Sequence, residues 1–147
     1  SWAIAGNLWA YEHTRNTHYL DVAGKLFDYW WDRVGAEIPP WDFNDPNPDA
    51  PLETSSSAIV CSALARLAVL DPLPEEAKPF VERLEPMLEN LCKHLTPVDD
   101  QDERPVGMLL DGCMNGRKHV AERNELIWGD FYLMEALYCL EKKGLAS

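Results

Sequence analysis

The carboxylates most suited to chemistry in this sequence lie in its most apolar segment, the run 124–137. Asp130 follows Gly129 in the middle of this run, and Glu135 comes five residues later. A buried carboxylate must be paired or hydrogen-bonded, so Asp130 is a candidate for a buried acid. On one helix, however, residues at this spacing point roughly 140° away from each other. We therefore expect no catalytic pair here, and we expect Asp130 to cap or brace a neighbouring helix.

The serines, cysteines and histidines form no recognisable catalytic or metal site. The stretch from Glu53 to Ala58 is rich in Ser and precedes an apolar run, which is typical of residues that cap a helix. A hydroxyl facing a substrate is the alternative. No Ser comes with a partnered His and acid, the His and Cys residues lack metal-ligand spacing, and no Gly-rich phosphate loop is present. The sequence thus predicts neither a nucleophilic triad nor a metal ion or organic cofactor.

Composition indicates which partners and which compartment to expect. The net charge is −12, from 25 acidic and 13 basic residues. Nucleic acids and anionic membrane surfaces both favour clustered Lys and Arg, so we expect neither as a partner. No segment approaches the roughly 20 apolar residues of a transmembrane span. Cys61, Cys92 and Cys139 fall in apolar helical runs, and we interpret them as reduced core residues, which favours a cytoplasmic location.

Tryptophan is frequent, with six Trp in 147 residues. Trp is commonly a core residue, but several Trp in one small domain also suit stacking against sugar rings. Trp41 and Phe43 lie in a loop, 35–52, whose prolines favour an extended backbone. Either its two aromatics tuck this loop onto the core, or it forms the rim of a sugar-sized cleft. A second long loop spans 96–123, and we expect both loops to be functional because loops of this length are otherwise uncommon in compact domains.

Five helical segments are expected to position these residues. The segments 17–34 and 74–95 each carry one apolar stripe, whereas 2–13, 54–70 and 124–144 are apolar on most or all sides. Two concentric layers would produce this alternation, with inner helices covered on all sides and outer helices exposed to solvent on one side. The pattern is typical of an α/α toroid. A helical solenoid is the competitor, but the sequence contains no internal repeat, and we expect one all-α domain over 1–147.

Gly129 requires an explanation within such a helix, because Gly in a helix interior costs roughly 1 kcal/mol relative to Ala. A close contact with another helix would require the missing side chain, and a pocket beside the helix is the alternative. We therefore predict that the run 124–137 is an inner helix, buried on all sides, with a close neighbour or a pocket at Gly129.

Four short motifs occur in an order that resembles a known family. They are Ser1-Trp2-Ala3-Ile4, which looks like the end of an Arg-Gly-Gln-x-Trp motif, Trp41-Asp42-Phe43 before a Pro-rich stretch, Glu53-Thr-Ser-Ser-Ser-Ala-Ile59, and Asn124-Glu-Leu-Ile-Trp-Gly-Asp130. Together they resemble the C-terminal half of the unsaturated glucuronyl hydrolases, glycoside hydrolase family 88, over essentially the whole chain. The resemblance implies the C-terminal half of an (α/α)6 barrel, a six-hairpin toroid of alternating inner and outer helices. We expect the chain to be a piece of a longer protein.

The resemblance also implies a reaction. The family acts on oligosaccharides left by polysaccharide lyases, which carry a 4,5-unsaturated uronic acid at the non-reducing end. An Asp protonates the vinyl carbon and activates water, so that the enol-ether double bond is hydrated, and the resulting hemiketal rearranges to release the sugar. No direct displacement at the anomeric carbon is needed, and no cofactor is implied.

The motifs also imply site residues. Trp2 matches the Trp that contacts the unsaturated sugar, and the Arg four positions before it would neutralise the uronate. Trp41 is expected at the rim of the substrate cleft. Lys118 falls where some members bind a substrate sulfate, although a solvated loop lysine is the simpler interpretation. Three residues are expected near the site in structural roles: Ser55, Trp128 and Asp130. Both essential Asp residues of the family fall outside this chain, so we expect no catalytic residue in it.

A partial barrel has consequences for activity and assembly. We expect the chain to be inactive alone and to expose apolar faces of its terminal helices, which a homodimer or association with the missing half of the barrel would cover. The closest rival enzyme is the unsaturated rhamnogalacturonyl hydrolase, which shares the fold and chemistry but prefers pectin fragments. From another class, a non-catalytic helical module binding carbohydrate or protein through its Trp-rich surface is the alternative. One departure from the family is Glu53, where Asp is usual.

Overall fold

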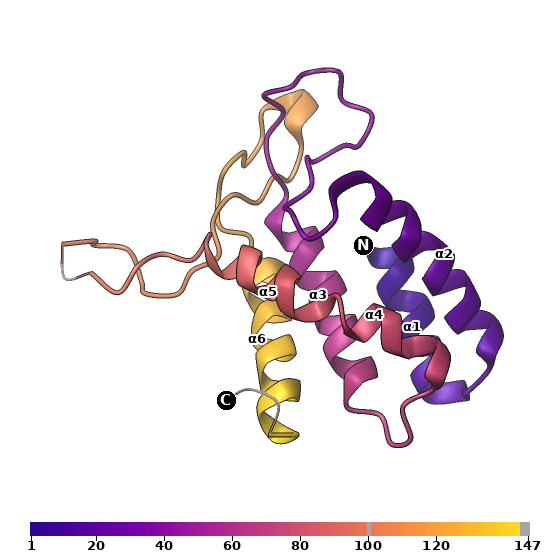
Figure 1. Ribbon diagram of the computed structural model, residues 1–147. Helices are drawn as coiled ribbons and strands as arrows, with labels where there is room; N and C mark the ends of the chain where they lie inside the picture. Colours follow the sequence, from indigo (N-terminus) through magenta and orange to yellow (C-terminus); the bar gives the residue numbers. More distant parts are fainter. Residues whose placement is uncertain (100, 145–147) are drawn as a thin grey trace.

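The structure is a computed structural model that describes residues 1–99 and 101–144 (Figure 1). Its α-helices are α1 (Trp2–Thr14), α2 (Thr17–Val34), α3 (Thr54–Ala68), α4 (Lys78–Val81), α5 (Leu84–Cys92) and α6 (Ile127–Lys142), and its short 3-10 helices are η1 (Glu75–Ala77) and η2 (Gly116–Lys118). The described residues contain isolated bridges but no strand, so the all-α fold class is confirmed. None of the described helices combines the length and apolarity that crossing a bilayer requires.

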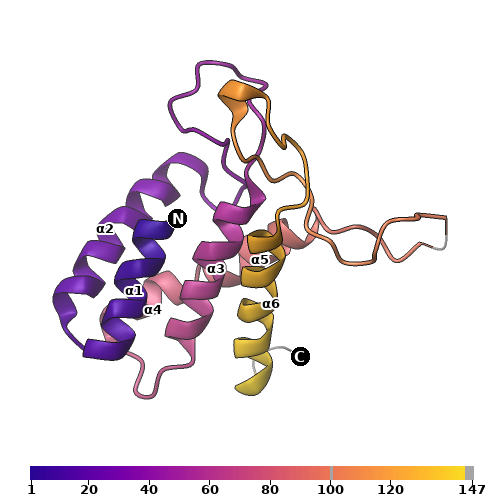
Figure 2. The ribbon, with the colours of Figure 1, turned by 180° about the vertical axis from the view of Figure 1, so that it is seen from behind.

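The helices lie in two layers (Figures 1 and 2). In the inner layer, α3 lies between α1 and α6 and packs against both. In the outer layer, α2 packs against α1, while α4 and α5 pack against α3. The order along the chain is therefore inner, outer, inner, outer, inner, as the alternation of apolar patterns predicted.

Two helices have the predicted distribution of apolar residues. Every residue of α3 is buried except Ser56 and Arg66, which confirms a helix covered on all sides. α2 has one buried stripe: Leu20, Ala23, Gly24, Phe27 and Trp30. Asn16 caps α2 by accepting the backbone N–H of His18 at 3.0 Å, and the other face of α2 is exposed to solvent.

The segment 74–95 was predicted as one helix, and this prediction is wrong. It is broken into η1, α4 and α5, and proline explains the breaks. Pro86 lacks the N–H that would bond the carbonyl of Glu82, and its ring would clash with that carbonyl, so α5 begins only at Leu84. Pro79 acts in the same way on the carbonyl of Glu75, in η1. The buried residues of α5 still form the predicted stripe: Leu84, Met87, Leu88 and Leu91.

The three cysteines predicted to be core residues differ in burial. Cys61 is fully buried, and this burial raises the pKa of its thiol. Cys139 is partly buried and packs against the core. Cys92 is the last residue of α5 and is exposed, at the edge of the buried stripe and about 100° around the helix from Leu91. The prediction is therefore wrong for Cys92.

The prediction that the run 124–137 is buried on all sides is also wrong. The helix begins at Ile127, and its buried residues are only Gly129, Leu133 and Ala136. Among the described helices, α3 alone packs extensively against α6, and α1 is likewise buried on one side only. The uncovered face of α6 carries exposed apolar side chains, here called the α6 stripe: Ile127, Phe131, Met134, Leu137 and Tyr138. An incomplete inner layer therefore leaves apolar surface open to solvent.

Gly129 is the point of close approach between α6 and α3. A β-carbon on Gly129 would lie 3.2 Å from the β-carbon of Ser55 and 3.3 Å from Cδ2 of Leu109. Ordinary van der Waals contacts of a β-carbon begin at 3.4 Å, so a larger residue would push the two helices apart. Of the two explanations offered for this glycine, the close helix contact is confirmed.

Replacing Gly129 by Ala is expected to destabilise the fold by about 1 kcal/mol, because crowding against Ser55 and Leu109 outweighs the gain in helix propensity. The matched control is Gly6→Ala in α1, where a β-carbon meets no atom within 4 Å and the same change should stabilise by about 0.5–1 kcal/mol. Thermal unfolding followed by circular dichroism would measure both. Equal shifts in Tm for the two variants would contradict tight packing at Gly129.

The α6 stripe is expected to make the isolated chain associate, because a contiguous apolar surface gains free energy when it is covered. Met134 is 70% exposed in the middle of the stripe, so Met134→Lys should shift the mass toward the monomer without lowering the unfolding temperature. The control is Val98→Lys, which makes a similar change at a position 90% exposed and outside α6. Light scattering at micromolar concentration would measure the mass. A monomeric unmodified chain, or equal effects of the two variants, would contradict the prediction.

Candidate functional site

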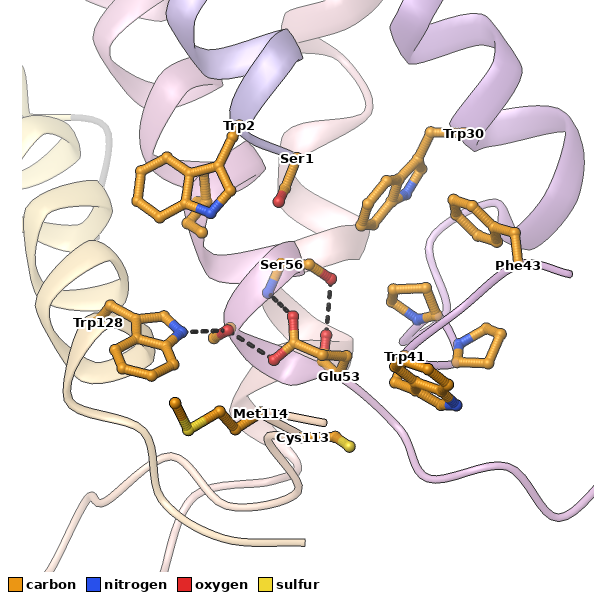
Figure 3. A pocket seen from close by; sticks show the side chains of 14 residues that line it. Ser1, Trp2, Trp30, Trp41, Phe43, Glu53, Ser56, Cys113, Met114 and Trp128 are labelled. Carbon is orange, nitrogen blue, oxygen red and sulfur yellow. Dashed lines mark hydrogen bonds between the residues drawn. The ribbon is translucent and has the colours of Figure 1, made fainter. Parts of the chain in front are cut away.

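A cleft of about 540 Å³ opens where α1, α3 and α6 begin. Its lining comes from the first residues of these helices, from α2 and the loop that follows it, and from the loop before α6. The lining residues are Ser1, Trp2, Trp30, Pro39, Pro40, Trp41, Phe43, Glu53, Ser55, Ser56, Ile59, Cys113, Met114 and Trp128 (Figure 3). Segments far apart in the sequence therefore meet at one site, at the N-terminal ends of the three inner helices.

Aromatic side chains form two sides of this cleft. Figure 3 shows Trp2 and Trp128 on one side and Trp30, Trp41 and Phe43 on the other. Trp30 and Phe43 pack edge to face with ring centroids 5.6 Å apart, which fixes the loop to α2. Of the two aromatics expected to tuck this loop onto the core, Phe43 does so, while Trp41 and Phe43 both line the cleft. Flat aromatic surfaces in an open cleft suit the apolar faces of sugar rings.

A chain of hydrogen bonds joins the polar groups of the cleft. Nε1 of Trp128 donates to Oγ of Ser55 at 2.8 Å, and Oγ of Ser55 donates to Oε1 of Glu53 at 2.6 Å. Oε2 of Glu53 accepts the backbone N–H of Ser56 at 2.7 Å. Glu53 is thus the N-cap of α3, which confirms the helix-capping interpretation of this stretch. The structure also brings together Ser55 and Trp128, two of the residues expected near the site.

Trp41 joins the two long loops as well as lining the cleft. Its Nε1 donates to Asp45 at 2.7 Å. A β-carbon on Gly116 would lie only 2.6 Å from that nitrogen, so the second loop packs directly on the indole ring. The guanidinium of Arg117 lies 5.9 Å from the ring centroid and 3.7 Å from Asp42. A backbone N–H and then the indole of Trp41 hold the pKa of Asp45 below its usual value.

Lys118 does not line the cleft. It is the last residue of η2 and is exposed. The cation of this turn that lies over the Trp41 ring is Arg117, one position earlier. The structure therefore does not bring Lys118 to the residues expected to contact a substrate.

Asp130 and Glu135 lie outside the cleft lining and bind different neighbours. Oδ1 of Asp130 accepts the backbone N–H of Leu109 at 2.7 Å, so Asp130 braces the loop before α6 and not a helix. Glu135 accepts a hydrogen bond from Ser62 and pairs with Arg66 at 3.2 Å. The two carboxylates therefore do not face a common substrate position.

Trp30, Cys113 and Met114 are among the lining residues that the sequence did not identify as site residues. Trp30 belongs to the buried stripe of α2, which gave no sign that its ring also reaches a cleft. For Cys113 and Met114 the signal was the apolar stretch 107–114 within an otherwise polar loop. Burial raises the pKa of the Cys113 thiol. Near the start of α6, a hydrogen bond to Asp130 raises the pKa of Glu125.

The described lining contains one carboxylate, Glu53, and no Asp, Lys, Arg or His side chain. Both oxygens of Glu53 are engaged as hydrogen-bond acceptors. The part of the chain that the structure describes contains no group of three His, Cys, Asp or Glu placed to hold a metal ion. The cleft can therefore stack against a ligand and hydrogen-bond it, but among its described side chains it offers no free acid or base.

Comparison with curated proteins identifies the relatives of this chain, although no protein-family model matches it. It is 30% identical over 141 residues to the unsaturated glucuronyl hydrolase of Formosa agariphila, covering 93% of the chain and 34% of that protein. It is 27% identical over 145 residues to the unsaturated glucuronyl hydrolase of Bacillus sp. strain GL1, covering 97% and 38%. The unsaturated chondroitin disaccharide hydrolase of Streptococcus pneumoniae is 29% identical, covering 93% and 35%. This chain is related to the unsaturated glucuronyl hydrolases.

Solved structures of unsaturated glucuronyl hydrolases agree with this relationship at the level of fold. The enzyme from Bacillus sp. GL1 matches with a TM-score of 0.78 at 23% identity, covering 99% of the chain and 38% of that protein. An enzyme described as specific for heparin matches with a TM-score of 0.81 at 20% identity, covering 99% and 40%. These enzymes are (α/α)6 barrels, so the predicted barrel architecture is confirmed over a partial span. The chain spans 34–40% of these relatives, somewhat less than half.

The contact between Trp41 and the second loop yields a prediction for this cleft. Gly116→Ala would place a β-carbon 2.6 Å from the indole, so Trp41 or the loop must move. We expect faster proteolysis of the loops and a changed Trp41 indole signal in NMR spectra, with α-helix content unchanged. The control is Lys118→Ala, which alters an exposed side chain of the same turn. Identical proteolysis rates for the two variants would contradict the loop contact.

Proposed function

We propose that this chain is part of an unsaturated glucuronyl hydrolase, a glycoside hydrolase that removes a 4,5-unsaturated uronic acid from lyase-generated oligosaccharides. The observation that carries the proposal is the meeting of Trp2, Trp41 and Trp128, from three separate motifs, around one cleft. Aromatic sides with few polar groups suit the stacking of a sugar ring. The names of the relatives support the reaction class.

The reaction proposed for the whole enzyme is hydration of the ring double bond. A carboxylic acid donates a proton to the vinyl carbon C4, and water adds at C5 after losing a proton to the resulting carboxylate. The product is a hemiketal, which opens and releases the next sugar as a free hydroxyl compound. The acid is regenerated, so atoms and charge balance without a cofactor. In this scheme the residues of this chain bind and orient the sugar and exclude bulk water from its faces.

The proton donor of this scheme is proposed to lie in the part of the enzyme beyond this chain. Glu53 is the carboxylate of the described cleft lining, and hydrogen bonds from Ser55 and Ser56 occupy both its oxygens. A carboxylate held as a double acceptor is poorly placed to give a proton to a substrate carbon. Asp130 is bound to the backbone of Leu109 outside the cleft. The family resemblance supports this assignment, since it implies that both essential Asp residues of the family fall outside the chain.

The substrate is proposed to be a fragment of an acidic polysaccharide of the glycosaminoglycan type. A mutant unsaturated glucuronyl hydrolase from Streptococcus agalactiae, matching with a TM-score of 0.79 at 21% identity, was solved with dGlcA-GalNAc6S. The described lining of the present cleft has no basic side chain, so the uronate would be neutralised from outside the chain, by the Arg expected before Trp2. Sulfate contacts by Lys118 would need movement of its turn.

Assembly, domain organisation and location follow the same proposal. We propose that residues 1–147 are one all-α unit of a larger barrel and that other barrel helices cover the α6 stripe, with a homodimer as the alternative. The four cysteines are free in the structure, which agrees with the proposed cytoplasmic location. Two alternative functions remain: an unsaturated rhamnogalacturonyl hydrolase, and a non-catalytic helical module that binds carbohydrate.

Titration of the chain with an unsaturated chondroitin disaccharide tests the proposed function. The indole NMR signals of Trp2 and Trp128 should shift, while the absorbance of the conjugated double bond stays constant because the proton donor is absent. The control is Trp31→Phe, outside the cleft lining, which should leave these shifts unchanged. Turnover by the chain alone would contradict the proposal that the proton donor lies outside this chain. Absence of any shift in the indole signals would contradict the proposal that the cleft binds a sugar. Tighter binding of an unsaturated rhamnogalacturonyl disaccharide would favour that rival enzyme.

A further inference from the structure

One hydrogen-bonded relay connects the cap of α3 to an aromatic side of the cleft. It runs from the indole N–H of Trp128, through the hydroxyl of Ser55, to Oε1 of Glu53, with distances of 2.8 and 2.6 Å. Trp128 lies in the first turn of α6, whereas Ser55 and Glu53 lie at the start of α3. Figure 3 shows Glu53 between the two aromatic sides, linked toward Trp128 by these bonds. The relay therefore ties the orientation of one aromatic ring to a carboxylate on another element.

The direction of the relay is fixed by its two ends. An indole N–H can only donate, and a carboxylate can only accept. The Ser55 hydroxyl has one proton, which it gives to Glu53, so its lone pairs are left to accept the proton of Trp128. A group at position 53 that donates to Ser55 would compete with Trp128 for those lone pairs. Because Glu53 accepts the Ser55 proton, it leaves Ser55 free to accept from Trp128, although Glu53 and the indole are not in contact.

The Trp128 ring is half-buried and packs against the edge of the hydrophobic core, and the hydrogen bond to Ser55 is the polar contact that directs its N–H. The N-cap of α6 is Leu126, which provides no side-chain cap, and Ile127 is exposed beside Trp128. The close approach at Gly129 brings the backbones of α6 and α3 together, but it does not fix the side-chain torsions of Trp128. The indole is a large planar surface, so a modest rotation about its side-chain bonds would change the width of the cleft.

We propose that Glu53 is a positioning residue that acts through Ser55 to hold the Trp128 ring as one side of the cleft. This proposal deepens the proposed function, on which its ligand-binding consequence rests. The placement of the ring itself does not depend on the identity of the ligand. Glu53 also bonds the backbone N–H of Ser56, so a purely structural role as the cap of α3 is the competing explanation.

The experiment measures the Trp128 indole signal in ¹⁵N-labelled chain, assigned with Trp128→Phe. Glu53→Gln should shift this signal and raise its exchange with water by about tenfold, because the amide supplies one acceptor oxygen where the carboxylate supplies two. Glu53→Asp keeps two acceptor oxygens and should restore the signal at least in part. Asn16→Ala is the matched control, because it removes a side-chain cap of similar kind from α2, far from Trp128 in sequence and outside the cleft lining.

A double-mutant cycle separates positioning from capping. If Glu53 acts on Trp128 through Ser55, then Ser55→Ala should shift the indole as much as the double variant does, and adding Glu53→Gln should change nothing further. Additive shifts, or an indole signal unchanged in Glu53→Gln, would overturn the proposal. An equal shift in Asn16→Ala would also overturn it, because general loosening would then be the cause.

Ligand binding provides a second readout that separates the two proposals. The probe is the unsaturated chondroitin disaccharide. Glu53→Gln should weaken its binding about fivefold, because the Trp128 ring loses the one hydrogen bond that holds it in place. If Glu53→Gln displaces the indole but binds the disaccharide with the same affinity as the unmodified chain, the proposed effect of Glu53 on ligand binding is wrong. If the unmodified chain does not bind the disaccharide, the proposed function fails, and the indole signals still decide whether Glu53 positions Trp128.

Discussion

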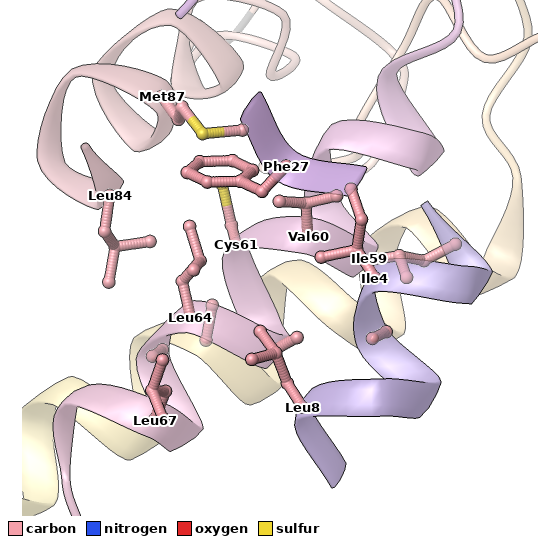
Figure 4. Close-up of a cluster of buried hydrophobic side chains, with 14 of the residues drawn as sticks. Ile4, Leu8, Phe27, Ile59, Val60, Cys61, Leu64, Leu67, Leu84 and Met87 are labelled. Atoms are coloured by element: carbon pink, nitrogen blue, oxygen red, sulfur yellow. The ribbon is translucent and has the colours of Figure 1, made fainter. Parts of the chain in front are cut away.

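Burial of α3 on every side is the constraint on which the rest of this structure depends. Its large apolar residues pack against α1 and the α4–α5 layer. Figure 4 shows them among the side chains of these helices and Phe27 of α2: Ile59, Val60, Cys61, Leu64 and Leu67. Its smaller residues lie against α6, where Gly129 lets the two backbones approach at Ser55. Such a helix is stable only when all its neighbours are present. Its position therefore fixes the positions of the helices around it.

The same packing places the cleft. Because α1, α3 and α6 lie side by side and begin at the same end of the inner layer, their first residues are brought together there. Trp2 and Trp128 then form one aromatic side, and the loop after α2 supplies the other. Close contact at Gly129 also brings Trp128 within hydrogen-bond distance of Ser55. Fold and site are thus consequences of one helix contact.

Local patterns in the sequence predicted the elements well and their surroundings less well. Helical period and apolarity gave α1, α2 and α3, and the glycine at 129 pointed to a close contact. The long helix at 74–95 failed because an apolar stripe continues through Pro79 and Pro86 although the backbone hydrogen bonds cannot. The burial of Cys92 and of the exposed face of α6 was predicted wrongly, because burial depends on which elements lie nearby. The local sequence of one helix does not contain that information. Trp30 was missed for the same reason.

The charges around the cleft indicate that its aromatic surface alone is not sufficient to bind an acidic sugar. The chain carries a net charge of −12, and the cleft contains Glu53. Free N–H groups at the start of a helix attract anions, and α6 begins at the cleft without a side-chain cap. At α3, however, Glu53 already occupies that position. The proposed uronate would thus meet partial positive charge from the start of α6 but no full positive charge from the side chains of the described lining. Binding the proposed uronate tightly would therefore require a cation from outside the described lining.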